Sequence, residues 1–333
     1  MTALEVEVDP GEAGFDAERL GRLGTHLNKY VDRGLLPGVN VLVSRGEEIV
    51  YRHMYGARDM ERALPVEADT IYRFYSMTKP ITSIAIMQLY EQGLFQLKDP
   101  ISRWIPSFAA SQVFSGGNAL EPQTRDATRD ISVHDLLTHT SGLTYHFHMA
   151  HHVDEMYRRA GFDWTKSPGD LESQCDILAS LPLLFDPGSE WNYSYSTDVL
   201  GRLIEVMSGL SLDAYLNKNI FEPIGMVDTG FSVPDGQEER FASCYYPDGE
   251  TQQATLLDDA QRSRYLREPE ALSGGGGLVS TLGDYHRFTQ ALRSGGALDG
   301  KRIIGRKTLE FMTSNHLPGG VDPVSYTHLR ANE

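Results

Sequence analysis

The sequence is poor in cysteine, in basic residues and in long apolar runs, and each shortage narrows what the protein can be. Its 333 residues include only two cysteines, Cys175 and Cys244, a scarcity that favours a reducing compartment. Lys and Arg number 30 against 46 Asp and Glu, and a net charge of −16 disfavours nucleic acid and anionic membranes as partners. No run of 18 apolar residues occurs, and residues 1–12 lack the pattern of a secretory signal. We therefore expect a cytoplasmic protein.

Two catalytic motifs are also absent, and a third kind of site has weak support. No serine stands in G-x-S-x-G, so the nucleophile elbow of the α/β-hydrolases is missing, and no H-E-x-x-H is present for a zinc protease. Five histidines fall between residues 139 and 152, but no cysteine joins them and Asp154 and Glu155 are the nearest acids. We favour a polar, histidine-rich loop near a pocket, with a zinc site as the alternative.

The chain is nevertheless rich enough in apolar residues, at 40%, to build one large or two ordinary domains. Apolar spacing predicts an amphipathic helix over residues 16–36, a β-hairpin over 37–55, a buried helix over 77–90 and a capped helix over 281–292. Between them we expect mostly helices, with a long polar loop around residues 116–130. This order indicates an α+β protein whose first part is discontinuous in sequence.

The strongest chemical signal is an S-x-x-K motif formed by Ser76 and Lys79. Ser76 falls at the start of the predicted buried helix, and Lys79 lies one turn later on the same face. The amine would then lie beside the hydroxyl, either as a base or as an electrostatic stabiliser of the alkoxide, and both roles suit acyl transfer. The alternative is a serine cap followed by a solvent-exposed lysine.

A second candidate is Tyr193, which follows a turn at residues 186–188 and precedes a predicted helix over 198–208. A tyrosine on such a loop can reach a distant serine and, as a phenolate stabilised by Lys79, take the serine proton and later return it to the leaving group. A tyrosine that simply packs at a helix start is an equally good interpretation of this residue alone.

Five blocks in order make the sequence resemble the serine β-lactamase and penicillin-binding-protein superfamily, and within it the class C-like family VIII carboxylesterases. The blocks are FYSMTKP (74–80), LKDP with WIP (97–100 and 104–106), LLTHTSGL (136–143), YSY (193–195) and SGGGGLVST (273–281). The similarity extends from about residue 15 to residue 320.

The resemblance implies an antiparallel sheet flanked by helices, with an inserted and mostly helical domain. We expect the sheet domain at residues 1–75 and 265–333, the helical domain at 76–264 and the active site between them. It also implies that Ser76 forms an acyl-enzyme, that Tyr193 and Lys79 transfer the proton, and that no metal or organic cofactor is needed. The oxyanion would be bound by the Ser76 N–H and by a second N–H from a late strand.

Two departures from the family pattern qualify these expectations. Where β-lactamases carry Asn two residues after the tyrosine, this chain has Tyr195, which favours esters over β-lactams. The third motif of the family, K-T-G, H-T-G or W-G-G, should follow residue 320 and is not found, so we expect residues 321–333 to be foreign to the fold and the last strands to be missing. We further expect Tyr195, Trp191 and Tyr145 to contact substrate, although core packing is as good an interpretation for Trp191 and Tyr145.

The favoured function is therefore hydrolysis of short-chain carboxylic esters, with a small-molecule ester as the only expected partner and a homo-oligomer left open. One alternative is a β-lactamase or D-alanyl-D-alanine carboxypeptidase, although the absent signal argues against work on the cell wall. The other alternative is a binding or scaffold protein that has the same fold but no catalytic activity.

Overall fold

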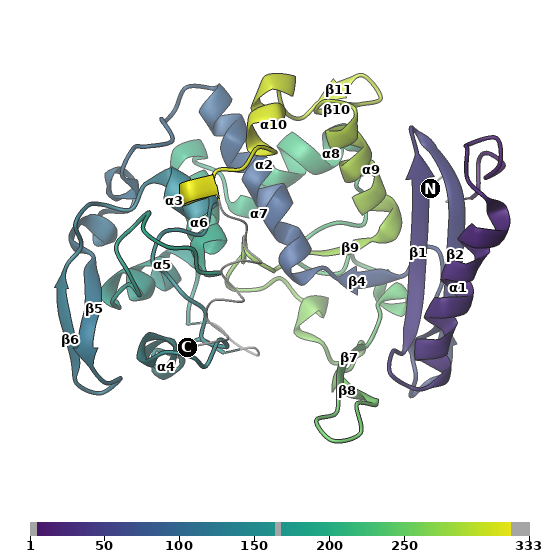
Figure 1. The fold of residues 1–333 in the computed structure, drawn as a ribbon, viewed down its shortest axis with the longest axis horizontal. Helices are drawn as coiled ribbons and strands as arrows, with labels where there is room; N and C mark the ends of the chain where they lie inside the picture. Colours follow the sequence, from purple (N-terminus) through teal and green to yellow (C-terminus); the bar gives the residue numbers. More distant parts are fainter. Residues whose placement is uncertain (1–4, 164–167, 321–333) are drawn as a thin grey trace. The chain divides into compact units, whose positions relative to one another are not determined.

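Helices and short antiparallel strands make up the residues that the computed structural model describes, 5–163 and 168–320 (Figure 1). The helices are α1 Ala17–Asp32, α2 Thr78–Glu91, α3 Val133–Leu137, α4 His152–Arg159, α5 Leu171–Ser180, α6 Ser196–Ser208, α7 Leu212–Leu216, α8 Glu222–Ile224, α9 Leu282–Arg293 and α10 Arg306–Met312. The strands are β1 Gly38–Arg45, β2 Glu48–Asp59, β3 Leu64–Pro65, β4 Ile71–Arg73, β5 Gln112–Gly117, β6 Pro122–Asp126, β7 Cys244–Pro247, β8 Ala254–Asp258, β9 Val279–Thr281, β10 Ala297–Leu298 and β11 Lys301–Arg302. The predicted α+β class is confirmed.

The chain divides into two units, and both are discontinuous in sequence. The first contains Met1–Phe74, Ile224–Pro269 and Leu278–Ser294, and the second contains Tyr75–Pro223, Glu270–Gly277 and the residues from Gly295 onward. Residues 224–264 therefore join the first unit and residues 295–320 join the second, whereas the sequence predicted the opposite for both segments. The reason is long-range contact: Phe241 bridges to Ile71 of β4, and Ile303 accepts a hydrogen bond from Gln88 of α2.

The first unit is built on the predicted hairpin. β1 and β2 pair antiparallel from Gly38 opposite Gly56 to Arg45 opposite Glu48, and α1 lies along this pair (Figure 1). Asp16 caps α1 by accepting from the Arg19 N–H, as expected for an acid at a helix start. The predicted link between early and late sequence is also present, since β4 pairs antiparallel with β9.

The second unit is organised around α2. Its residues Ile81, Ile84, Ile86 and Leu89 are all at most 1% exposed, so the helix is apolar on every side and buried as predicted. Each such side chain contributes about 1.5–3 kcal/mol when removed from water. α6 packs directly against α2, and this contact brings together the segments that precede the two helices, which include Ser76 and Tyr193.

One expectation about this unit was wrong. Residues 116–130 are not a plain loop, because β5 and β6 form an antiparallel hairpin across them, with Gln112 opposite Asp126. The turn uses Gly117, whose φ is +83°, and the Asn118 side chain accepts from the Leu120 N–H. β6 is exposed along its whole length, so it lacks the apolar alternation by which a strand is recognised in sequence.

Candidate active site

Ser76 lies in a 3₁₀ turn, Tyr75–Met77, immediately before α2. The preceding residue, Tyr75, has a φ of +45°, a conformation that costs a non-glycine residue free energy and is concentrated at functional sites. Pro80 stands in the first turn of α2, where the missing N–H would have had no helical partner. Ser76 is exposed, so a reactant can reach its hydroxyl.

Lys79 is held between Ser76 and a late loop. Its Nζ donates to the Ser76 Oγ at 3.2 Å and to the carbonyl oxygen of Gly275 at 2.7 Å. Nζ also lies 4.5 Å from the ring centroid of Tyr193 and 5.3 Å from that of Tyr145, both within cation–π range. The spacing predicted from helical geometry is thus realised.

Tyr193 completes the group from a distant part of the chain. Its hydroxyl donates to the Ser76 Oγ at 2.5 Å. The loop that carries it is anchored by Asn192, whose backbone N–H donates to the His139 carbonyl at 2.8 Å and whose side chain donates to the Leu143 carbonyl at 3.0 Å. The structure therefore brings together the three residues predicted to be catalytic.

His139 contacts the loop that carries Tyr193. Its φ is +56°, and its Nδ1 is 3.2 Å from the Oγ of Ser194. Burial, with a smaller effect of the Lys79 charge, lowers the pKa of His139 to about 3. The imidazole is therefore neutral near neutral pH and lies beside the Tyr193 ring, with 5.0 Å between the ring centroids.

Sequence reasoning missed Asp198, a buried acid in the first turn of α6. Its Oδ1 accepts from the Ser273 hydroxyl at 2.5 Å and from the Gly275 N–H at 3.2 Å. Burial raises the pKa of Asp198, and the Ser273 bond and the positive charge of Lys79 partly oppose the rise. The only hint in the sequence was the glycine run after Ser273, which indicates a close approach of backbone to another element.

The three residues expected to contact substrate differ in position. Tyr145 is buried beside the group, and burial raises its pKa well above the usual value, so it remains a neutral phenol. Trp191 is less buried than Tyr145, and its ring centroid lies 6.5 Å from that of His139. Tyr195 is buried in an aromatic cluster, where its hydroxyl is 2.7 Å from the Nδ1 of His146. The structure therefore does not bring the Tyr195 hydroxyl to Ser76.

The histidine-rich stretch is spread over separate contacts. His139 meets Ser194, His146 meets Tyr195, and His151 accepts from the Val153 N–H at the start of α4. Within residues 5–163 and 168–320, no three His, Cys, Asp or Glu side chains are grouped as a metal site requires.

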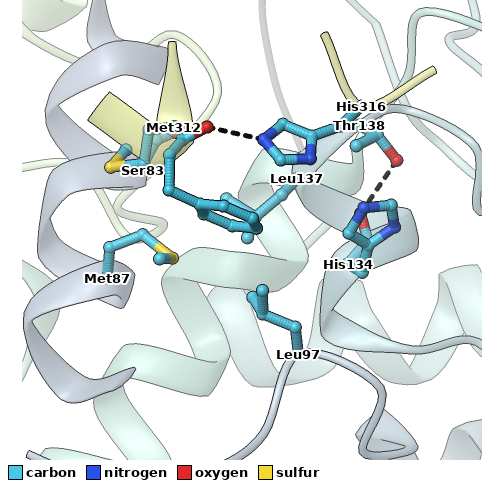
Figure 2. A pocket seen from close by; sticks show the side chains of 9 residues that line it. Ser83, Met87, Leu97, His134, Leu137, Thr138, Met312 and His316 are labelled. Carbon is cyan, nitrogen blue, oxygen red and sulfur yellow. Dashed lines mark hydrogen bonds between the residues drawn. The ribbon is translucent and has the colours of Figure 1, made fainter. Parts of the chain in front are cut away.

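A cavity of about 130 Å³ in the same unit is lined mainly by apolar side chains (Figure 2). Its lining includes Met87, Leu97, His134, Leu137, Phe311 and His316. The rings of His134 and His316 meet there edge to face, with 5.8 Å between their centroids and an angle of 81° between their planes. Ser76, Lys79 and Tyr193 are not in the lining, so this cavity is distinct from the group around Ser76.

The expected third motif and the foreign tail both concern residues 321–333, which lie outside the described residues. Both expectations therefore stay predictions.

Comparison with known proteins decides the family. The family model described as Beta-lactamase matches residues 24–327. The chain belongs to the Beta-lactamase family. The superfamily predicted from the five sequence blocks is thus confirmed.

Esterases and acyltransferases are among its relatives. Esterase EstB of Burkholderia gladioli is 32% identical over 316 residues, which cover 88% of this chain and 75% of that protein. Simvastatin synthase (LovD) from Aspergillus terreus matches with a TM-score of 0.78 at 26% identity, covering 95% of this chain and 78% of the other. EstCE1, described as a hydrolase with promiscuous acyltransferase activity, matches with a TM-score of 0.76 at 27% identity, covering 93% and 80%.

Ser76, Lys79 and Tyr193 all lie in the second unit. Among the described helices, none combines the length and the apolar character that crossing a membrane requires.

Proposed function

We propose that this protein is a serine carboxylesterase that hydrolyses short-chain carboxylic esters through an acyl-enzyme on Ser76. One observation carries the proposal: the Tyr193 hydroxyl and the Lys79 amine both lie within hydrogen-bond distance of the Ser76 Oγ, at 2.5 and 3.2 Å. A serine hydroxyl is a weak nucleophile unless a neighbouring group takes its proton, and both candidates for that role are in contact.

The first half of the reaction forms the acyl-enzyme. With Tyr193 as a phenolate beside the Lys79 ammonium, the serine proton moves to the Tyr193 oxygen while Ser76 Oγ bonds to the ester carbonyl carbon. The tetrahedral intermediate collapses by breaking the bond from carbon to the alkoxy oxygen. The departing alcohol takes the proton from Tyr193, which leaves the acyl group on Ser76.

The second half releases the acid. Water attacks the acyl carbon and gives a proton to Tyr193, and the bond from carbon to Ser76 Oγ breaks as that oxygen recovers the proton. Backbone N–H groups that face the oxyanion would contribute about 3 kcal/mol each to lowering the barrier, and the Ser76 N–H is the donor that we assign from family resemblance.

Relatives support ester chemistry over β-lactam chemistry. EstB, which is 32% identical, is named an esterase. The presence of Tyr195 where β-lactamases have Asn agrees with this choice. With an alcohol acceptor in place of water, the same acyl-enzyme would transfer its acyl group to that alcohol. Acyl transfer is the activity in the name of the relative monacolin J acid methylbutanoyltransferase of Aspergillus terreus, and EstCE1 is described as having it as a promiscuous activity.

The test is intact-mass spectrometry after treatment with a fluorophosphonate, with Ser76→Ala as the control. We expect a single adduct on the wild type and none on the variant. Folded wild-type protein without an adduct would contradict the proposal and favour a silent binding protein.

Substrate class is decided by comparing rates on p-nitrophenyl butyrate and a chromogenic cephalosporin, with and without an added alcohol. We expect the butyrate ester to react faster. Faster hydrolysis of the cephalosporin would identify a β-lactamase, and ester product formed from the added alcohol would identify an acyltransferase.

A further inference from the structure

The loop at residues 273–277 is bound to two helices at once. From α2, Lys79 donates to the Gly275 carbonyl at 2.7 Å and Thr82 donates to the Gly274 carbonyl at 2.8 Å. From α6, Asp198 accepts from the Ser273 hydroxyl and from the Gly275 N–H. Every one of these groups lies in the second unit.

The glycines allow this close approach. A Cβ on Gly274 would lie 2.7 Å from the carbonyl oxygen of Thr197 on α6. A Cβ on Gly275 would lie 2.4 Å from the Asp198 Oδ2 and 3.1 Å from the Tyr145 hydroxyl. Such distances are too short for a real side-chain carbon, so only glycine lets the backbone lie directly against α6 and its carboxylate.

Asp198 connects the loop to α6 through hydrogen bonds. It is 2% exposed, and one oxygen of its carboxylate receives both the Ser273 hydroxyl and the Gly275 N–H. Because both hydrogen bonds end on one buried oxygen, they fix the peptide of Gly275 against α6. The carbonyl of the same residue then receives Lys79, at 2.7 Å.

We propose that Asp198 is a positioning residue, which holds the Gly275 carbonyl in place so that this carbonyl keeps the Lys79 amine on Ser76. Lys79 has a long and flexible side chain, and its contact with Ser76, at 3.2 Å, is longer than its contact with Gly275. The bond to the Gly275 carbonyl is therefore the stronger of the two hydrogen bonds that Lys79 donates. The expected effect on catalysis rests on the proposed function, because Lys79 has a catalytic role only in the mechanism proposed above.

Three variants separate the parts of this chain of contacts. Asp198→Asn keeps the shape and an oxygen that accepts from the same two donors, Asp198→Ala removes the acceptor, and Ser273→Ala removes one donor. We expect the rate of Ser76 labelling by a fluorophosphonate, and kcat on p-nitrophenyl butyrate, to fall by roughly 100-fold in Asp198→Ala and by roughly 10-fold in the other two. KM should change by less than about threefold, since the contact acts on the nucleophile rather than on substrate binding.

The matched control is Asp284→Asn. Asp284 is a second buried acid with a raised pKa, and it likewise accepts from one backbone N–H, that of Asp228, and from one hydroxyl, that of Thr229. We expect this variant to lower Tm while the folded protein keeps wild-type kcat. If Asp198 had a purely structural role, Asp198→Asn would also lower Tm and leave kcat at the wild-type value. That result would overturn the inference.

A crystal structure of Asp198→Asn or Ser273→Ala gives a readout that needs no activity. We expect Lys79 to leave the Gly275 carbonyl and take more than one rotamer. Lys79 still bonded to Gly275 in both variants, with labelling at the wild-type rate, would overturn the inference. Wild-type protein that is not labelled at Ser76 would instead contradict the proposed function, and the position of Lys79 in the variants would still decide the inference.

Discussion

The Tyr193 hydroxyl lies 2.5 Å from the Ser76 Oγ although 117 positions separate the two residues in sequence. Ser76 comes from the turn before α2, and Tyr193 comes from the loop before α6. The packing of α6 on α2 therefore creates the contact, and any change that separates these helices should reduce reactivity at Ser76.

Removal of the Tyr193 hydroxyl tests the proton-transfer role directly. We expect Tyr193→Phe to lower kcat on p-nitrophenyl butyrate by roughly 10²–10⁴-fold, because general acid–base groups contribute about that much. KM and Tm should change little, since the ring still packs beside Tyr145 and His139. Steady-state kinetics and thermal unfolding measure these quantities, and a variant with wild-type kcat would exclude Tyr193 as the proton-transfer group.

Gly275→Ala and Gly276→Ala form a matched pair within one loop. The new Cβ at residue 275 would meet Asp198 at 2.4 Å, whereas at residue 276 the nearest atom, on Tyr75, is 3.7 Å away. We expect Gly275→Ala to lower both Tm and the rate of Ser76 labelling, because the loop must shift away from α6. Gly276→Ala should stay close to the wild type. Equal labelling rates in the two variants would contradict the close-packing explanation of the glycine run.

Acid stability should depend on His139. Its pKa falls from 6.5 to about 3 on folding, so between these values the unfolded chain binds a proton that the folded chain does not. The free energy of unfolding must then decrease as pH falls from about 6.5 toward 3. His139→Asn keeps a side chain that tolerates the φ of +56° but cannot titrate in this range. Denaturant unfolding at pH 7 and 4.5 should show a smaller loss for the variant, and equal losses would contradict this account.

Tyr195 gives a prediction that separates packing from substrate contact. Its ring centroid lies 4.4 Å from that of Tyr145 and 4.9 Å from that of Phe162, and its hydroxyl meets His146. Tyr195→Phe should reduce stability by about 1 kcal/mol, the value of one hydrogen bond, with KM unchanged. Tyr195→Asn should cost about 3–5 kcal/mol through the cavity that it leaves. A large rise in KM for Tyr195→Phe would instead indicate that Tyr195 contacts substrate.

Features set by neighbouring residues were predicted well. Asp16 marked the start of α1, the turn near Gly46 marked the first hairpin, and Thr281 with Asp284 marked α9. In each case the decisive contacts join residues a few positions apart. The β5–β6 hairpin was missed because β6 is exposed along its whole length and therefore lacks apolar alternation.

Domain boundaries and the supporting acid were not predictable in this way. Asp198 reads in sequence as an ordinary acid in the first turn of a helix, where it suits the helix dipole. Its contacts with Ser273 and Gly275 join positions 75 and 77 residues apart, which no local pattern reveals. Residues 224–264 were assigned to the wrong unit for the same reason.

Sequence alone predicted that Ser76 and Lys79 share one face, because the two residues are three apart at a helix start. That Lys79 bonds to Ser76, rather than extending into solvent, is shown by the tertiary structure. Its position between a turn and a predicted helix made Tyr193 a candidate among 16 tyrosines, and family resemblance favoured it over simple packing. Its contact with Ser76 exists only through the packing of α6 on α2. The burial of Tyr195 and the link from Asp198 to Lys79 were likewise decided by tertiary structure. Local geometry is encoded by spacing along the chain, whereas contacts between distant segments depend on how the whole core packs.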